Sequence, residues 1–87
     1  MAESRTAILE KLKPIFQLIF GDKELILNEN SDSKSIANWD SLANVKLLVT
    51  VEKVLELRFR TSDITGLADV GELISVIQMM QDENDDG

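Results

Sequence analysis

Hydrophobic residues recur with the spacing of an amphipathic helix in three parts of this 87-residue chain. The first stripe consists of Ile8, Leu12, Ile15, Phe16 and Ile19. Gly21 follows this stripe, and because glycine readily adopts the left-handed conformation that closes many helices, we expect the helix to end there. Pro14 lacks a backbone donor and clashes with the preceding turn, so it predicts a kink or a shortened first half.

The second pattern begins at Asp40, a residue type favoured at the N-cap because its carboxylate accepts a hydrogen bond from a free helix amide. Its apolar sector is unusually wide, which indicates either packing on several sides or a face left for a partner. We assign most of this sector to the core. The third pattern begins at Asp69, which together with Glu72 resembles a capping box. The apolar positions of the two helices are Leu42, Val45, Leu48, Val49, Val51 and Leu55, and then Val70, Leu73, Ile74, Ile77 and Met80.

Residues 22–40 show no helical period and are rich in Asp, Asn and Ser, so they predict a long loop between the first two helices. The serine-rich stretch 31–35 is interpreted as turn-forming, with phosphorylation as the less favoured alternative. The apolar side chains expected to hold the loop on the core are Leu25, Ile26, Leu27, Ile36 and Trp39.

Two short segments connect the second and third long helices. Residues 57–60 alternate apolar and basic side chains without a second strand to pair with, so they predict an extended link. Residues 61–67 predict one short helix, with Ile64 and Leu67 pointing inward. The predicted fold class is therefore all-α, a small bundle of three main helices plus one short helix, with a long loop between helices 1 and 2.

Composition and charge narrow the range of functions. The chain has 9 Lys and Arg against 16 Asp and Glu, a net charge of −7, which disfavours binding to nucleic acid and insertion into anionic membranes. The absence of Cys and His excludes disulfides, thiol nucleophiles and Ser-His-Asp triads, and no metal site is predicted. Because no apolar run has membrane length and the N-terminus shows no signal-peptide pattern, we expect a cytoplasmic protein.

The negative charge is concentrated at the C-terminus. Residues 82–87 contain four acids and no base, so they account for −4 of the −7. Such a run is typical of a solvated terminus. We therefore predict one domain at 1–81 followed by an acidic disordered tail at 82–87.

The tripeptide Asp40-Ser41-Leu42 is the main candidate for chemistry. Ser41 would be the first residue of the second helix, where its hydroxyl is exposed and the helix N-terminus presents unpaired amides with a partial positive charge. A phosphate ester is stabilised in such a place, because both the amides and the dipole favour a negative group. An ordinary N-cap followed by a helix explains the same three residues, so the tripeptide alone leaves both interpretations open.

A wider match favours the first interpretation. Residues 39–59, WDSLANVKLLVTVEKVLELRF, resemble the second helix and the following segment of an acyl carrier protein, while residues 8–21 and 69–77 resemble the first and last helices of that family. The resemblance implies that a phosphopantetheinyl transferase esterifies Ser41 with 4′-phosphopantetheine, using coenzyme A and magnesium. It also implies roles at this site for Asp40 and Leu42, which capping and core packing equally explain.

The resemblance further implies a carrier that is not itself an enzyme. Acyl or aminoacyl cargo would be held as a thioester on the arm, loaded by a ligase or transferase and consumed by a synthase or another acyl-transferring enzyme. We expect the carrier to be a monomer. Val45, Val49, Ile64 and Leu67 would line a space that shelters the cargo, although each is also explained as a core residue.

Two features depart from the family's pattern. Asn38-Trp39 stands where many fatty-acid carriers have a small, glycine-containing stretch, and Lys46 and Lys53 lie on a helix that is strongly acidic in those carriers, here beside Glu52 and Glu56. We interpret these departures as favouring a specialised lipid, polyketide or related pathway. The alternative function is a helical protein–protein interaction module whose exposed second-helix face binds a partner helix. A metal-assisted hydrolase that uses clustered acids is a remote third possibility.

Overall fold

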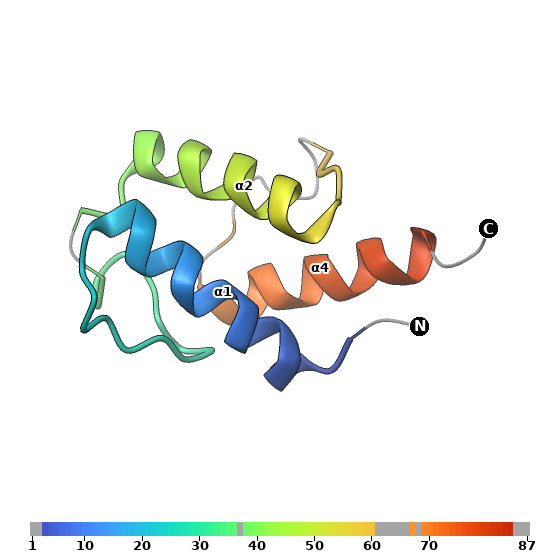
Figure 1. Cartoon of the computed structure of the whole chain (residues 1–87), viewed down its shortest axis with the longest axis horizontal. Helices are drawn as coiled ribbons and strands as arrows, with labels where there is room; N and C mark the ends of the chain where they lie inside the picture. The colour runs from blue at the N-terminus through green and yellow to red at the C-terminus, as the bar shows by residue number, and fades with distance from the viewer. Residues whose placement is uncertain (1–2, 37, 61–66, 68, 85–87) are drawn as a thin grey trace.

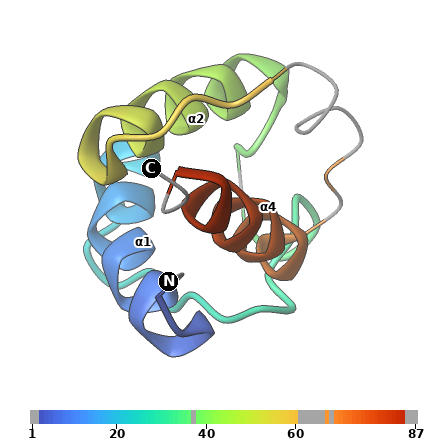
Figure 2. The same cartoon turned by 90° about the vertical axis from the view of Figure 1, so that its right-hand side faces the viewer.

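A computed structural model describes residues 3–36, 38–60, 67 and 69–84 of the chain. These residues form three helices, α1 (Arg5–Phe20), α2 (Ser41–Leu55) and α4 (Val70–Asn84) (Figure 1). α1 packs against both α2 and α4, and the start of α1 lies at the same end of the molecule as the end of α4 (Figures 1 and 2). The predicted all-α bundle is confirmed. The short helix predicted at 61–67 lies outside the described residues, apart from Leu67.

The predicted stripe of α1 forms the centre of the core. Ile8, Leu12, Ile15 and Phe16 are buried, and Ile19 packs partly buried against them. Gly21 closes the helix in the left-handed conformation at φ +63°, as its position predicts. Pro14 lies inside the helix, which continues on both sides of it from Arg5 to Phe20, so the shortened first half is wrong. The apolar stripe on both sides of Pro14 is packed in the core, and this packing compensates for the missing backbone donor.

The caps of the other two helices are as predicted. Asp40 caps α2, and at α4 the Asp69 carboxylate accepts a hydrogen bond from the Glu72 amide at 2.9 Å. The core face of α4 consists of Val70, Leu73, Ile74, Ile77 and Met80. α4 extends to Asn84, three residues beyond the predicted domain boundary at residue 81, and residues 85–87 lie outside the described part.

The long loop before α2 is held on the core by some of the expected side chains. Leu27 and Ile36 are buried, while Leu25 and Trp39 are partly buried against the core. Ile26 is 83% exposed, so its predicted role is wrong. Leu27 takes the inward direction in this non-helical stretch, and because adjacent side chains of an extended segment point to opposite sides, Ile26 faces solvent.

Backbone hydrogen bonds join this loop to the start of α4. The Val70 amide donates to the Ser31 carbonyl at 2.9 Å, and the Gly71 amide donates to the Glu29 carbonyl at 2.8 Å. These are helix N-terminal amides that have no partner within the helix itself. A Cβ atom on residue 71 would lie 3.1 Å from the Glu29 carbonyl oxygen, so glycine permits the close approach.

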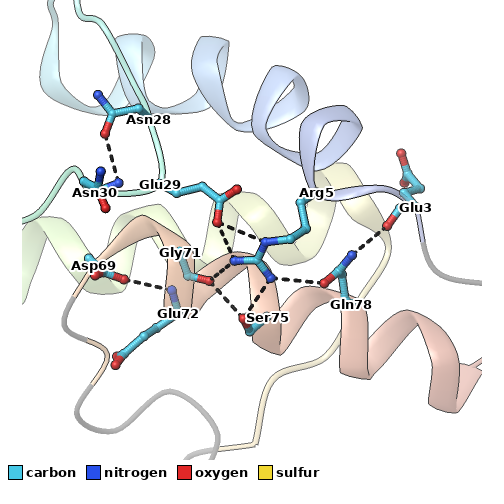
Figure 3. Close-up of polar contacts among 10 residues, drawn as sticks. All are labelled: Glu3, Arg5, Asn28, Glu29, Asn30, Asp69, Gly71, Glu72, Ser75 and Gln78. Carbon is cyan, nitrogen blue, oxygen red and sulfur yellow. Dashed lines mark hydrogen bonds and ion pairs between the residues drawn. The ribbon is translucent and has the colours of Figure 1, made fainter.

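Arg5 reinforces the same junction from α1 (Figure 3). Its guanidinium donates to the Glu29 carboxylate at 2.6 and 3.0 Å and to the Gly71 carbonyl at 2.8 Å. It also donates to Ser75 Oγ and to Gln78 Oε1. One side chain thus ties α1, the loop and α4 together, which fixes the loop that leads to α2.

Candidate functional site

Ser41 is exposed at the first position of α2. Beside it, Asp40 Oδ1 accepts a hydrogen bond from the Ala43 amide at 2.9 Å, and the Asp40 carbonyl accepts from the Asn44 amide at 2.9 Å. The amides of Ser41 and Leu42 have no hydrogen-bond partner among the described residues. The structure therefore presents the Ser41 hydroxyl beside free amides at the positive end of a helix dipole.

The residues before Ser41 are anchored by an aromatic cluster. The Trp39 ring meets Phe16 edge-on, with 5.4 Å between ring centroids, and lies 6.1 Å from the ring of Phe20. Trp39 Nε1 donates to Asn44 Oδ1 at 3.1 Å, which links the loop to the first turn of α2. Trp39 therefore packs the loop, as its bulk before the motif predicts.

Asn38 lets the chain turn into α2. Its φ of +69° lies in the left-handed region, where asparagine is tolerated better than most residues. The Asp40 amide then donates to the Asn38 carbonyl at 3.0 Å. Asparagine thus supplies here a backbone conformation for which glycine is the usual residue.

An open pocket of about 350 Å³ adjoins Ser41. Of the residues expected at the site, Asp40, Ser41 and Leu67 line it, so the structure brings Leu67 beside the serine. Ser33, Trp39 and Asn44 complete the lining. Sequence reasoning missed Ser33 and Asn44 as site residues. The one available signal for Asn44 was the indole of Trp39, because a partly buried N–H requires an acceptor nearby.

Leu42, Val45 and Val49 lie on the solvent side of α2, with exposed fractions of 65%, 58% and 43%. Assigning most of the wide apolar sector to the core is therefore wrong for these residues. The reason is that Leu47, Leu48 and Val51 already fill the core side of the helix, so a residue on the opposite side points outward. Among the described residues, nothing encloses Val45 and Val49, and Ile64 lies outside that part of the chain.

Charges on α2 are mixed. Lys46 and Lys53 are exposed, and neither forms an ion pair with any residue that the structure describes. Glu52 is partly buried and accepts a hydrogen bond from the Phe59 amide at 2.8 Å. Within the described ranges, no group of three or more His, Cys, Asp or Glu side chains is placed to hold a metal ion. None of the helices in those ranges is long and apolar enough to cross a membrane.

Comparison with known proteins agrees with this fold. The solution NMR structure of a holo acyl carrier protein from Geobacter metallireducens superimposes with a TM-score of 0.79 at 28% sequence identity, covering 87% of this chain and 87% of that one. No family model matches the chain, and no curated protein matches it either. The chain has the fold of an acyl carrier protein, which confirms the resemblance seen in the sequence and supports a carrier role.

Proposed function

We propose that Ser41 carries 4′-phosphopantetheine and that the chain transports acyl or aminoacyl intermediates as thioesters. The observation that carries the proposal is the exposed Ser41 hydroxyl at the first position of α2, in a fold similar to that of a holo acyl carrier protein. When bound, the arm supplies the thiol that a chain without cysteine lacks. The chain's own residues contribute attachment and positioning, and the chemistry on the cargo belongs to its partner enzymes.

Three features of the site fit such a group. The Ser41 hydroxyl is accessible to form the ester, and the pocket beside it leaves room on the side of Leu67. The amides of Ser41 and Leu42, which have no partner among the described residues, and the dipole of α2 favour a negative phosphodiester. Asp40 holds the first turn through its hydrogen bond to Ala43, so the serine keeps its orientation.

The partners follow from this role. Leu42 is exposed one residue after Ser41, so it offers an apolar contact to a phosphopantetheinyl transferase. A loading ligase or transferase and a synthase would approach the same end of the molecule, because the cargo is tethered there. Lys46 and Lys53 of α2, which form no ion pair with any described residue, favour a specialised lipid, polyketide or related pathway. We propose that this pathway is cytoplasmic. We propose Leu67, at the pocket, as the described residue best placed to contact cargo near the arm.

Intact-mass measurement tests the proposal. The protein is incubated with coenzyme A, magnesium and a broad-specificity transferase, and it should gain the mass of one phosphopantetheine group. Ser41→Ala should gain nothing. Ser33→Ala is the matched control, because Ser33 lines the same pocket from the loop and should leave the mass gain intact. If the native chain gains no mass while a known carrier is modified in parallel, the proposal is wrong.

A helical interaction module is the second candidate, and the exposed apolar residues of α2 favour it. Such a module would bind its partner through Leu42, Val45 and Val49 without any modification. The two functions differ in whether they require the hydroxyl oxygen of Ser41. Ser41→Ala abolishes cargo loading in a carrier, whereas an interaction module keeps its full activity.

A further inference from the structure

Two residues that line the pocket beside Ser41 have no part in attaching a group to that serine. Trp39 precedes α2, Asn44 lies in its first turn, and both side chains are half-buried. They are joined to each other, because Trp39 Nε1 donates a hydrogen bond to Asn44 Oδ1 at 3.1 Å. We name these two side chains the Trp39–Asn44 pair.

The indole of Trp39 fixes the orientation of the Asn44 amide. An indole N–H donates and cannot accept, so the atom of Asn44 that meets it is the carbonyl oxygen. The amide nitrogen Nδ2 therefore keeps its two donor hydrogens, and no described residue accepts a hydrogen bond from it. A half-buried donor at a pocket is satisfied by whatever occupies the pocket, either water or a ligand.

Trp39 is itself held by the core. Its ring meets the buried ring of Phe16 edge-on, with 5.4 Å between centroids, and lies 6.1 Å from the ring of Phe20. The donor on Asn44 is therefore held in place before any ligand arrives. Such preorganisation strengthens binding, because little side-chain freedom remains to be lost.

The lining of the pocket indicates the chemistry of its occupant. Asp40 is the one charged residue in the described lining, and its carboxylate is engaged by the Ala43 amide. Beside it, the lining combines the neutral donor of Asn44 with the apolar surfaces of Trp39 and Leu67. These features suit a neutral group that has a carbonyl oxygen next to an aliphatic part. The volume of about 350 Å³ lies at the lower end of the range for small-molecule sites, about 300–1,000 Å³, so the group is small.

We infer that the Trp39–Asn44 pair binds the pantoyl part of the arm carried by Ser41. This part follows the phosphate directly, is neutral, and combines an amide carbonyl with two methyl groups. Asn44 Nδ2 donates to that carbonyl, and the Trp39 ring covers the methyl groups. The tether to Ser41 raises the local concentration of the group at the pocket, so one hydrogen bond and a small apolar contact suffice. The inference rests on the proposed function and adds the path by which the arm leaves Ser41.

NMR of the native chain before and after modification tests this inference. The isotope-labelled protein is converted with unlabelled coenzyme A and a phosphopantetheinyl transferase. Its indole signal is unambiguous, because the chain has one tryptophan. The Trp39 indole and the Asn44 side-chain amide should both shift, and nuclear Overhauser effects should join them to the methyl groups of the arm. Shifts confined to backbone amides next to Ser41 would show an arm that projects into solvent, and would overturn the inference.

Two variants separate a contact with the arm from a merely structural role. Asn44→Asp keeps an oxygen for the indole but removes the Nδ2 donor, so the ratio of docked to undocked arm should fall about fivefold, as expected for one neutral hydrogen bond. Trp39→Phe changes no charge but leaves the Asn44 amide free to turn over, and it should weaken the Overhauser effects between the methyl groups and Asn44. Asn30→Asp makes the same chemical change in the loop before α2 and should alter neither.

The remaining outcomes also decide the question. Weakening in Asn44→Asp alone would indicate repulsion of the phosphate by the new charge, and equal weakening in Asn44→Asp and Asn30→Asp would indicate a general effect of charge. Either result would contradict the inference. Circular dichroism checks that each variant folds, and the comparison of the native chain before and after modification needs no variant. Intact mass separates the two proposals: a mass gain without contacts to the pair refutes only this inference, whereas no mass gain refutes the proposed function as well.

Discussion

At the scale of single residues, Asp40 and Ser41 differ in position and contacts: Asp40 caps α2, and Ser41 presents its hydroxyl to solvent. Asp40 ends the loop, and its carboxylate is occupied by the Ala43 amide. Ser41 has an exposed hydroxyl and an amide without a partner among the described residues. A capping side chain and an exposed hydroxyl on the next residue need no cavity to bring them together, because the start of the helix itself fixes their geometry.

Replacing Asp40 tests the cap. Asp40→Ala removes the acceptor for the Ala43 amide and should lower the free energy of unfolding by about 1 kcal/mol, whereas Asp40→Asn keeps an acceptor and should lose only a few tenths. Urea denaturation followed by circular dichroism measures both changes. Equal losses in the two variants would show that the charge, and not the cap, is what stabilises α2 at this residue.

Residue-scale features were predictable where the cause is local. The caps Asp40 and Asp69 and the closing Gly21 each act within a few residues of their position, so the sequence indicates them. Arg5 and Gly71 were not recognised, because their partners are distant in sequence. Arg5 and the Gly71 carbonyl that it binds are 66 residues apart, and no local pattern encodes that contact.

At the scale of elements, α2 shows where a hydrophobic pattern is ambiguous. Apolar residues occupy both of its sides, and the sequence alone does not indicate which side meets α1. Packing resolves the ambiguity: Leu47, Leu48 and Val51 take the inner side, and Leu42, Val45 and Val49 remain exposed. The loop before α2 shows a similar ambiguity. The sequence predicts that both Ile26 and Leu27 hold the loop on the core, but of these two neighbours Leu27 is buried and Ile26 is exposed.

A pair of truncations distinguishes the two sides of α2. Leu47 is fully buried, so Leu47→Ala should lower the free energy of unfolding by about 2–5 kcal/mol through lost burial and the cavity left behind. Val45 is exposed on the same helix, and Val45→Ala should change the free energy of unfolding by no more than about 0.5 kcal/mol. Denaturant titration compares the two. A large loss at Val45 would contradict its exposed position.

At the scale of the whole molecule, a polar cluster ties the two ends of the described chain together. Glu3 accepts a hydrogen bond from Lys11 of α1 at 2.7 Å and another from Gln81 of α4 at 2.9 Å. The Lys11 hydrogen bond lowers the pKa of Glu3 most, the Gln81 hydrogen bond adds to this, and burial opposes it. Because the pKa of Glu3 is lower in the folded protein than in the unfolded chain, ionised Glu3 stabilises the fold at pH values above the unfolded pKa.

The pH dependence of stability tests this cluster. The contribution of Glu3 is fully present at neutral pH and is lost as the pH falls from the unfolded value of about 4.3 through the lower folded pKa. The melting temperature of Glu3→Gln should therefore lie below that of the native chain at pH 7 and approach it in acid. Lys11→Gln removes the main cause of the shift and should reduce the pH dependence. A difference that is the same at pH 7 and pH 3 would contradict this account.

Within the described part of the chain, the order and number of long helices followed from the sequence, since each repeats an apolar stripe between recognisable caps. The C-terminal end of α4 was not predictable from the sequence, because the acidic residues that predict a tail also continue the helix as far as Asn84. The pocket beside Ser41 depends on the path of the loop in space. The sequence therefore did not indicate that Ser33 and Leu67 line this pocket together. The position of Ser41 at the start of a helix was predictable from the sequence, because the cap and the apolar pattern that mark it are local.

The most direct test of the central claim is peptide-level mass spectrometry of the native chain after reaction with coenzyme A and a phosphopantetheinyl transferase. We predict that a single phosphopantetheine group is found on the peptide containing Ser41 and that fragment ions place it on that side chain. Modification of Ser33 or another loop serine, or no modification of any peptide, would contradict the account.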